Sequence, residues 1–354
     1  MIMKGYVIAG ANKAEWRDFP VPKINPYGAL IKTEIVSPCT TDIHLLQTGC
    51  ASIPHLVGKA MGHEMVGTVQ EVGSAVKNFK PGDRVVVSAC QPNFRSMEAQ
   101  AGMPKLNNTS QYWIDDPDRG GSFIEQYYLL DADMNLAHIP DSVTMEQAIM
   151  VPDMVSTAFE GVRELEIKYG DTVVMLGVGP VGLMGVCAAV LKGAGRVFVI
   201  GSRKVCFDVA KEYGATDFID YHDGDFVKKI LELNGGPVDG VLVSGGSSSS
   251  ITEALNLVKR GGIVSNVTAF FADENTVLSN VAWGYGYSEK TIKAVECTGG
   301  RWILEKFLSL VEYGRLQPEK LITHRFHGMG KIEDAVQLFI DHDRSLIKPI
   351  VYFD

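Results

Sequence analysis

The sequence predicts an α/β fold that joins a β-rich domain to a doubly wound parallel sheet. A glycine-rich turn lies between two strand-like apolar runs near the middle of the chain. Short apolar runs punctuated by Gly, Pro and Asp fill the part before that turn. The chain has 354 residues, which is longer than one hydrophobic core usually serves, so two domains are expected.

The glycine-rich turn is the centre of a βαβ unit. Val173–Leu176 and Val197–Ile200 are short β-branched and apolar runs, as in buried parallel strands, and we expect a helix over Val181–Lys192 between them. The turn has G-x-G-x-x-G spacing, with Gly177, Gly179 and Gly182. These glycines allow a tight turn, a close approach of the backbone to a pyrophosphate and packing of helix on strand. The unit therefore predicts a dinucleotide site at the helix N-terminus.

Two other interpretations of this stretch are open. A glycine-rich turn can join a strand to a helix without binding a ligand. Thr172–Leu191 also carries no charge and is long enough to pass for a membrane span. The glycines and the proline inside it favour a buried strand, turn and helix, so no membrane segment is expected.

The residues after the second strand indicate which dinucleotide binds. NAD sites usually have Asp or Glu there to bind the ribose hydroxyls. This chain has Gly201, Ser202 and Arg203, with no carboxylate before Asp208. A hydroxyl beside a guanidinium suits a 2′-phosphate, so the sequence favours NADP(H). The alternative is that Arg203 is an ordinary surface residue at a helix start.

The doubly wound sheet continues beyond this unit. Further strands alternating with helices are expected at Phe218–Tyr221, Gly240–Ser244, Ile263–Val267 and Ile292–Val295. Ser247–Ser250 is expected to be a loop. Helices over Arg301–Tyr313 and Lys331–Asp341 precede a final strand, Pro349–Phe353, that can return to the first domain.

Composition argues against several classes of protein. The net charge of −9 argues against nucleic acid as the main partner. The six cysteines are sparse and unpatterned, which favours reduced thiols and a metal ligand over a disulfide framework. The N-terminus lacks the apolar core of a signal peptide, so a cytoplasmic location is expected.

The β-rich half contains three residue groups whose side chains bind metals. Its strands are expected at Tyr6–Ala9, Ala29–Val36, Met65–Val72 and Arg84–Ser88, and a long polar loop at Gln91–Gly121. Cys39 follows one strand, His63 and Glu64 precede another, and Asp153 precedes a helix. Thiolate, imidazole and carboxylate are ligand types of Zn²⁺. A buried Cys is also often a small hydrophobe, and a His beside a Glu is often a surface pair.

Together these residues resemble the zinc-dependent medium-chain alcohol dehydrogenases. The run Gly62-His63-Glu64-x-x-Gly67-x-x-x-x-x-Gly73-x-x-Val76 fits that family's zinc signature, and the similarity extends from about Lys4 to the C-terminus. Three segments are similar to the branch of tetrameric, NADP-dependent secondary alcohol dehydrogenases: Asp131–His138, Gly201–Arg203 and Leu346–Pro349. The resemblance implies a GroES-like catalytic domain at 1–153 and 297–354, and a Rossmann domain at 154–296.

The resemblance implies one catalytic zinc ion per chain. Cys39, His63 and Asp153 match its ligands, and Glu64 matches a carboxylate that can join the metal when no substrate is bound. Many relatives hold a second, structural zinc with four cysteines in a later lobe, where this chain has only Cys90. No structural zinc is therefore expected.

Further roles follow from the same resemblance. Thr41 matches a hydroxyl that hydrogen-bonds the substrate oxygen, and His44 matches a histidine that passes the proton to solvent. Trp113 matches an aromatic side chain of the substrate pocket. The matching cofactor contacts are Gly177, Val178, Gly179, Pro180, Val181, Gly182, Gly201, Ser202, Arg203, Tyr221, Val267, Thr268 and Ala269.

The implied activity is hydride transfer between NADP(H) and a small secondary alcohol, ketone or aldehyde. A homotetramer or dimer is expected, with no nucleic-acid or membrane partner. Gln91 and Glu296 leave open a polyol or terpene-alcohol dehydrogenase on the same scaffold. A non-catalytic nucleotide-binding relative is a further alternative, although the complete set of metal-site residues with Thr41 and His44 argues against it.

Overall fold

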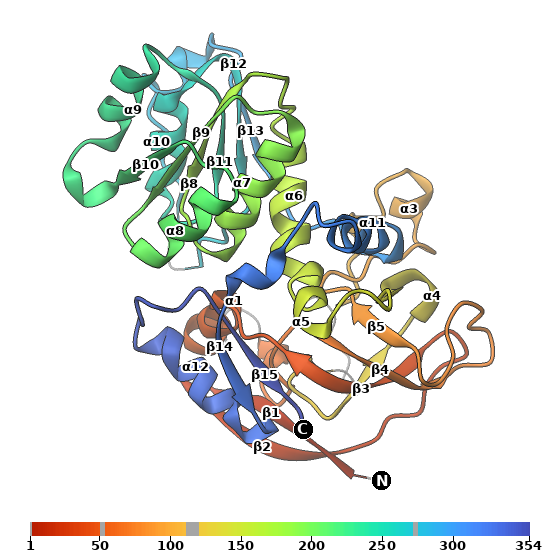
Figure 1. Ribbon diagram of the computed structural model, residues 1–354. Coiled ribbons are helices and arrows are strands. Elements are labelled where there is room, and N and C mark those ends of the chain that lie inside the picture. Colours follow the sequence, from red (N-terminus) through yellow and green to blue (C-terminus); the bar gives the residue numbers. More distant parts are fainter. Residues whose placement is uncertain (1, 50–53, 111–119, 272–274) are drawn as a thin grey trace. The chain divides into compact units, whose positions relative to one another are not determined.

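The computed structural model describes residues 2–49, 54–110, 120–271 and 275–354. They divide into two compact units, one formed by Met1–Ser156 and Thr298–Asp354, the other by Thr157–Cys297 (Figure 1). The second unit is a single continuous segment, inserted between the two pieces of chain that form the first.

The unit Thr157–Cys297 contains a six-stranded parallel sheet in the order β10-β9-β8-β11-β12-β13. Starting from β8, the chain adds strands in one direction and then, from β11, in the other, which is the order of doubly wound dinucleotide folds. The strands are β8 (Thr172–Leu176), β9 (Arg196–Gly201), β10 (Asp217–Asp220), β11 (Val238–Val243), β12 (Val258–Asn266) and β13 (Thr291–Ala294).

Helices connect these strands and cover both faces of the sheet. They are α6 (Ser156–Arg163), α7 (Pro180–Lys192), α8 (Lys204–Glu212), α9 (Phe226–Asn234) and α10 (Ser249–Leu257). Right-handed crossovers that run in opposite directions along a sheet place their helices on opposite faces. Accordingly α7 and α8 pack together on one face, and α9 and α10 on the other (Figure 1). Because α10 begins at Ser249, the loop expected at Ser247–Ser250 is two residues too long.

The core of this unit explains why its strands were easy to predict. Val174, Phe198 and Val241 are fully buried beneath the helices, as in sheets covered on both faces. The longest helix, α7, has 13 residues. Within the part of the chain that the structure describes, no helix is long and apolar enough to cross a membrane.

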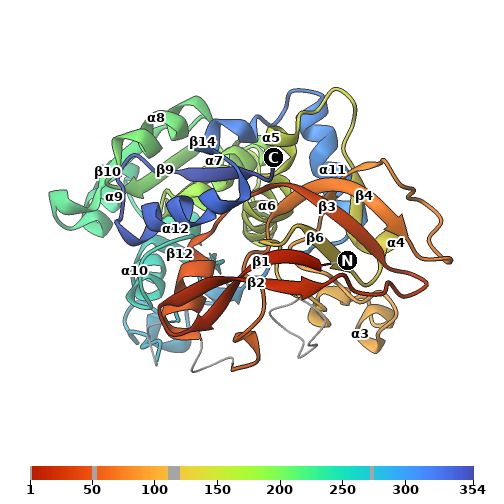
Figure 2. The ribbon, with the colours of Figure 1, turned by 90° about the horizontal axis from the view of Figure 1, so that it is seen from below.

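The unit formed by the two ends of the chain is built on a mostly antiparallel sheet. Its order is β14-β15-β3-β4-β5-β7, and β6 also pairs with β3. A separate antiparallel ribbon is formed by the first two strands (Figure 2). The strands are β1 (Ile2–Gly10), β2 (Lys13–Pro20), β3 (Ala29–Val36), β4 (Met65–Val72), β5 (Arg84–Val87), β6 (Gln126–Leu129), β7 (Leu136–His138), β14 (Ile322–His327) and β15 (Lys348–Tyr352).

Short helices occupy the connections of this sheet. The expected loop Gln91–Gly121 contains two of them in its described part, α3 and the 3-10 turn η3. The α-helices are α1 (Thr40–His44), α3 (Met97–Gln100), α4 (Ala132–Asn135), α5 (Met145–Ala148), α11 (Arg301–Glu312) and α12 (Ile332–Ile340). The 3-10 turns are η2 (Pro54–Leu56), η3 (Pro104–Leu106), η7 (Pro318–Leu321) and η8 (Met329–Lys331), and the π-helical turns are η1 (Leu45–Gly49) and η4 (Val151–Val155).

The last strand returns to the beginning of the chain. In β15, Val351 pairs with Val36 of β3, while the other side of β15 pairs with β14 (Figure 1). Ser37 fixes the junction, because its hydroxyl donates a 2.7 Å hydrogen bond to the carbonyl oxygen of Pro349. This pairing brings Lys348 beside the segment that carries Cys39.

Candidate metal centre and nucleotide site

Four side chains from three separate stretches of chain converge in the unit formed by the chain ends. One ligand atom from each of Cys39, His63, Glu64 and Asp153 lies within 4.8 Å of all the others. The Oδ2 atom of Asp153 lies 3.9 Å from the sulfur of Cys39 and 3.3 Å from Nε2 of His63. Nε2 of His63 also lies 3.7 Å from Oε1 of Glu64. The structure thus brings together the four residues that the sequence proposed for a metal.

Cys39 is placed by the start of α1. It is the residue before the helix, with an extended backbone. Its N–H donates a 2.9 Å hydrogen bond to Oδ2 of Asp42, the usual contact of an acidic side chain at a helix start. Thr41 lies in the first turn of the same helix, with its hydroxyl oxygen 3.8 Å from the Cys39 sulfur. His44 ends the helix, and burial lowers the pKa of its imidazole, so the neutral ring is favoured.

His63 and Glu64 are placed by a glycine that no other residue can replace without strain. Gly62 has φ +88°, and a Cβ atom there would lie 2.3 Å from Cδ1 of Phe123. Phe123 is fully buried, so it has little room to move. The backbone can therefore turn from the core into β4 only with glycine at position 62, which explains the Gly-His-Glu run.

Asp153 lies in a π-helical turn, η4, between α5 and α6. The N–H of Val155 bonds to the carbonyl of Met150, five residues back, at 3.0 Å. The hydroxyl of Ser156 also donates a 2.7 Å hydrogen bond to the carbonyl of Val151. Such turns insert one extra residue into a helix and occur frequently at functional sites. The sequence indicated a helical entry here, but nothing in its apolar spacing indicated the extra residue.

Asp42 completes the cluster, although the sequence did not single it out. Its Oδ1 lies 3.2 Å from Nδ1 of His63, and the side chain is buried. Because a carboxylate can only accept, the neutral ring carries its proton on Nδ1 and leaves the lone pair of Nε2 for the cluster. This is the arrangement that orients histidines in metal sites. The spacing of Cys39 and Asp42, three residues apart at a helix start, was the available signal.

Lys348 is the second partner that the sequence did not single out. Its Nζ lies 2.6 Å from Oε1 of Glu64 and donates a 2.9 Å hydrogen bond to the carbonyl of Pro38. The lysine side chain is 1 % exposed and the glutamate 0 %. Burial raises the pKa of Glu64 to about 7, although the charge of Lys348 opposes that rise. Burial would lower the pKa of Lys348, but the negative charges of Glu64, Cys39 and Asp153, together with the hydrogen bond to Glu64, outweigh burial and raise that pKa.

The donor set fits a zinc ion. Oε2 of Glu64 is buried and has no hydrogen-bond partner among the described residues. A polar atom left in this state is costly unless another group satisfies it. Sulfur, nitrogen and oxygen donors around one point are what Zn²⁺ takes. Across residues 2–49, 54–110, 120–271 and 275–354, no second group of three or more such ligands lies this close together.

The glycine-rich turn has the geometry that a pyrophosphate needs. Gly177 directly follows β8 and has φ +98°, and a Cβ on Gly182 would lie 2.0 Å from the carbonyl oxygen of Gly177. A Cβ on Gly179 would instead meet nothing within 4 Å. Gly182 is therefore required for helix packing, whereas Gly179 leaves open space at the N-terminus of α7. Ser244, at the end of β11, donates a 2.8 Å hydrogen bond to the Gly177 carbonyl at the point where the strand order reverses.

The other predicted cofactor residues lie at the same edge of the sheet. Gly201 and Asp220 are paired at the ends of β9 and β10, so the residues that follow them, Ser202 and Tyr221, are neighbours. The Ser202 hydroxyl donates a 3.1 Å hydrogen bond to the Tyr221 hydroxyl. The remaining predicted contacts follow them along this edge: Arg203 precedes α8, and Val267, Thr268 and Ala269 follow β12.

Gln91 is held by hydrogen bonds inside the unit formed by the chain ends. Gln91 is buried, and its amide nitrogen donates to the Tyr127 hydroxyl at 2.6 Å and to the Ser88 carbonyl at 3.3 Å. These bonds fix its amide group inside the β-rich unit, so Gln91 does not support a preference for polar substrates. Trp113 lies outside the described residues.

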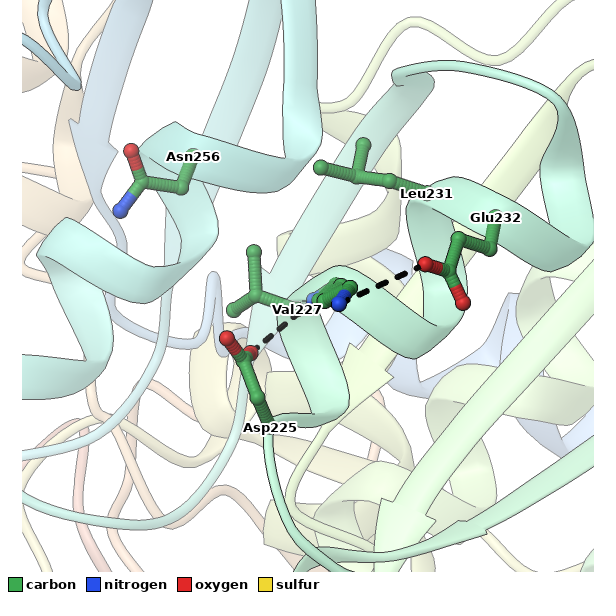
Figure 3. Close-up of a pocket in the computed structure, with 6 residues that line it drawn as sticks. Asp225, Val227, Leu231, Glu232 and Asn256 are labelled. Carbon is green, nitrogen blue, oxygen red and sulfur yellow. Dashed lines mark hydrogen bonds and ion pairs between the residues drawn. The ribbon is translucent and has the colours of Figure 1, made fainter.

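A shallow pocket lies on the unit Thr157–Cys297, which is called the nucleotide unit below, separate from both of these sites. Figure 3 shows Asp225, Val227, Leu231, Glu232 and Asn256 around it. The ammonium of Lys228 lies 3.9 Å from Glu232, and Asp225 accepts a hydrogen bond from the Lys228 backbone N–H. The pocket holds none of the predicted site residues, and we assign it no ligand. Its lining comes from α9, its N-terminal cap and α10: Asp225, Val227, Lys228, Leu231, Glu232 and Asn256.

Comparison with known proteins identifies the family. Residues 25–141 match the alcohol dehydrogenase GroES-like domain, and residues 180–310 match the zinc-binding dehydrogenase family. The chain therefore belongs to the zinc-binding, medium-chain alcohol dehydrogenases, which confirms the predicted family and fold class.

The similarity to individual relatives extends over almost the whole chain. It is 43 % identical over 351 residues to the NADP-dependent isopropanol dehydrogenase of Thermoanaerobacter brockii, covering 99 % of both chains. It is 42 % identical over 351 residues to the enzyme of the same name from Clostridium beijerinckii, again covering 99 % of both. Among solved structures it is similar to the alcohol dehydrogenase TADH from Thermus sp. ATN1, with a TM-score of 0.88 and 25 % identity over 99 % of both chains.

Proposed function

We propose that this chain is a zinc-dependent dehydrogenase that transfers a hydride between NADP(H) and small secondary alcohols or ketones. The observation that carries the proposal is the convergence of Cys39, His63 and Asp153 within 4.8 Å of one another. The two curated relatives are named as NADP-dependent isopropanol dehydrogenases, which supports the same cofactor and substrate class for this chain.

Cys39, His63 and Asp153 would hold the ion, with Glu64 as a further ligand when no substrate is present. A bound zinc ion supplies Lewis-acid stabilisation of the negative charge that develops on the substrate oxygen. Asp42 holds the His63 ring in the tautomer that leaves Nε2 available. We propose one zinc per chain, because Cys90 is the only cysteine in the lobe where relatives hold a structural zinc with four.

Thr41 and His44 would move the proton. The Thr41 hydroxyl lies next to the Cys39 sulfur, where it can donate to or accept from a substrate oxygen. The His44 imidazole is kept neutral by burial, so it can accept a proton and release it to solvent. The nicotinamide supplies the hydride chemistry, and the protein supplies orientation.

The proposed cofactor contacts lie at the carboxyl ends of the parallel strands in the nucleotide unit. The pyrophosphate would bind the turn Gly177–Gly182, and the 2′-phosphate would bind Ser202, Arg203 and Tyr221, with Val267–Ala269 nearby. The domain division proposed from the sequence, 1–153 with 297–354 and 154–296, assigns the metal ligands to one domain and these contacts to the other. We also propose a cytoplasmic homotetramer or dimer.

The metal proposal is tested by zinc content and turnover together. Purified protein should contain about one zinc per chain and oxidise small secondary alcohols with NADP⁺, and a chelator should abolish both. Cys39→Ser should lose zinc and turnover but keep NADPH binding. Cys90→Ser is the matched control and should keep the zinc. Bound zinc without turnover on any alcohol or ketone would favour a non-catalytic relative, and full activity after chelation would refute the proposal.

The cofactor proposal is tested by comparing NADPH with NADH. Arg203→Ala should weaken NADPH binding about 10- to 100-fold, since a guanidinium–phosphate bond is lost, while NADH binding changes little. The adjacent Lys204→Ala is the control, because Lys204 is highly exposed and pairs with Asp208. Equal use of both cofactors by the parent protein would contradict a 2′-phosphate site.

A further inference from the structure

A buried ion pair lies directly behind the metal cluster. Lys348 and Glu64 are 284 residues apart in sequence, yet their charged atoms are 2.6 Å apart and almost fully excluded from solvent. Burying two charges is favourable only when both are well paired and hydrogen-bonded. Lys348 meets this condition through Glu64 and the Pro38 carbonyl. In Glu64, only one of the two carboxylate oxygens is paired and hydrogen-bonded in this way.

The asymmetry of the Glu64 carboxylate is informative. Oε1, the oxygen that accepts from Lys348, is also 3.7 Å from Nε2 of His63. Oε2 is buried without a hydrogen-bond partner in the described structure. The carboxylate therefore contacts the ammonium of Lys348 while one of its oxygens also lies within 4.8 Å of the ligand atoms of Cys39, His63 and Asp153, which could hold a metal ion.

We propose that Lys348 is a positioning residue that keeps Glu64 an exchangeable rather than a permanent ligand of the metal. This inference rests on the proposed zinc site. A buried carboxylate that leaves a metal ion needs another positive partner, because an unpaired charge inside the protein is strongly unfavourable. Lys348 is that partner, already in contact with Oε1. Without Lys348, the metal ion would be the only cationic partner left for Glu64. The carboxylate would then stay bound to the metal and block the coordination position that the substrate oxygen needs.

A purely structural role for Lys348 predicts something different. The lysine also connects β15 to the segment before Cys39 through its bond to Pro38. If that were its whole role, its removal would lower stability without changing which ligands the metal accepts. The two roles are therefore separated by the binding of an added ligand to the metal, a measurement that needs neither substrate nor turnover.

The test uses cobalt-substituted protein and imidazole as the added ligand. The visible absorption of Co²⁺ reports its ligands, so an imidazole titration gives the affinity of the open position. Lys348→Met should weaken imidazole binding about 10- to 100-fold, the usual range for removing a group that supports metal ligands, and should slow loss of cobalt to a chelator. In a Glu64→Gln background the same change should have no effect on imidazole binding.

Two further variants keep the test decisive. Lys290→Met is the control for losing a half-buried lysine, because Lys290 donates to the carbonyls of Leu255 and Ala282 in the other unit. It should leave the cobalt spectrum unchanged. If Lys348→Met does not fold, Lys348→Gln keeps a hydrogen-bond donor without the charge and should shift imidazole affinity in the same direction.

The proposal is overturned if both substitutions at position 348 leave imidazole affinity unchanged. It is also overturned if Lys348→Met has an equal effect with Glu64 and with Gln at position 64. A parent protein that binds no cobalt would instead refute the zinc site itself. The two failures are therefore distinguishable.

Discussion

At the residue scale, the proposed metal cluster depends on residues that are not among its ligands. Asp42 orients His63, Gly62 gives the backbone room to turn beside Phe123, and Lys348 holds Glu64. Each of these contacts involves buried atoms, where packing and hydrogen bonds leave few alternatives. Substitution at these positions should therefore change the cluster as strongly as substitution of a ligand.

Asp42→Asn should weaken zinc binding about 10- to 100-fold without unfolding the protein. In the native site both oxygens accept, one from the Cys39 N–H and the other facing Nδ1 of His63. An amide has one oxygen, so its NH₂ must face one of these nitrogens and disturb either the cysteine or the tautomer of the histidine. Zinc affinity, measured by competition with a chromogenic chelator, checks this.

The control is Asp133→Asn. Asp133 also accepts from two backbone N–H groups, those of Lys77 and Asn78, and among the described residues it has no hydrogen bond to a histidine. The zinc affinity of the Asp133→Asn variant should equal that of the parent protein. An equal loss of affinity in both variants would contradict an orienting role for Asp42.

Gly62→Ala should be more destabilising than Gly82→Ala. Both glycines have positive φ, +88° and +96°, but a Cβ at position 82 would meet nothing within 4 Å. Gly82→Ala should therefore lose about 1–2 kcal/mol of unfolding free energy from backbone strain alone. Gly62→Ala adds the clash with Phe123, about 1–3 kcal/mol more. Urea denaturation of both variants measures the difference, and equal losses would show that Phe123 moves aside.

At the element scale, a side-chain ion pair stabilises the pairing of two neighbouring strands in the nucleotide unit. Arg196, at the start of β9, binds Asp217, at the start of β10, with two parallel bonds of 2.7 and 2.8 Å. The guanidinium also lies 4.3 Å from the centre of the Phe198 ring. The pair joins the edge strand β10 to its neighbour β9 at their amino ends, whereas Ser202 and Tyr221 follow the carboxyl ends of the same two strands.

Asp217→Asn should lower the unfolding free energy by about 1 kcal/mol at pH 7, because the pair is partly exposed. The hydrogen bond from Arg196 holds the pKa of Asp217 below its ordinary value. A carboxyl whose pKa is lowered on folding stabilises the fold above its unfolded pKa of ~3.9, and loses that contribution as the pH falls through the folded value. The difference from the parent should therefore shrink below about pH 4.

Denaturation at pH 7 and at lower pH checks this prediction. Asp208→Asn is the control, since the pair of Asp208 with Lys204 is mostly exposed and should contribute little. A loss for Asp217→Asn that does not depend on pH would show that packing, rather than charge, fastens the strands.

Predictability from sequence differs between the two units for physical reasons. The parallel strands are covered on both faces, so Val173–Leu176 and Val197–Ile200 appear as continuous apolar runs and were located to within about a residue. In contrast, β2 carries exposed charged residues, and β6 and β7 span only 4 and 3 residues. Strands of this kind form because they pair with neighbouring strands. The spacing of apolar residues in a single sequence carries no information about that pairing.

In the candidate metal site, likewise, some residues could be predicted from the sequence and others could not. Cys39, His63 and Asp153 were singled out because they match the ligands that the resemblance to the zinc-dependent alcohol dehydrogenases implies, whereas their side-chain chemistry alone left other interpretations open. The partners of these ligands were not recognised, because Lys348 and Glu64 are neighbours only through the pairing of β15 with β3. The π-helical turn around Asp153 was missed as well, since one inserted residue leaves no mark on the apolar pattern.

At the scale of the whole molecule, the nucleotide unit exposes a sheet edge. Strand β13 ends the parallel sheet, and its burial pattern is largely exposed. Large apolar side chains precede it on the surface, including Val281 at 67 % exposure and Tyr287 at 81 %. An unpaired edge beside exposed apolar groups is a typical surface for association with another chain. This supports the proposed oligomer.

Val281→Lys combined with Ile292→Lys should reduce the mass of the particle in solution, because charges would be placed on that surface. Light scattering coupled to size-exclusion chromatography measures the mass. Leu233→Lys is the control, since Leu233 is exposed on α9 rather than along this edge. An unchanged oligomer in the double variant would place the contact on another face.

The insertion of one unit within the other fixes an order of biosynthesis. A ribosome completes Thr157–Cys297 before it makes β15, so the nucleotide unit can fold while the chain is still growing. Cys39, His63 and Asp153 are by then synthesised, but the ammonium group that neutralises Glu64 is not. A nascent chain would therefore meet zinc with this carboxylate still uncompensated, and only the final strand would restore the balance of charge.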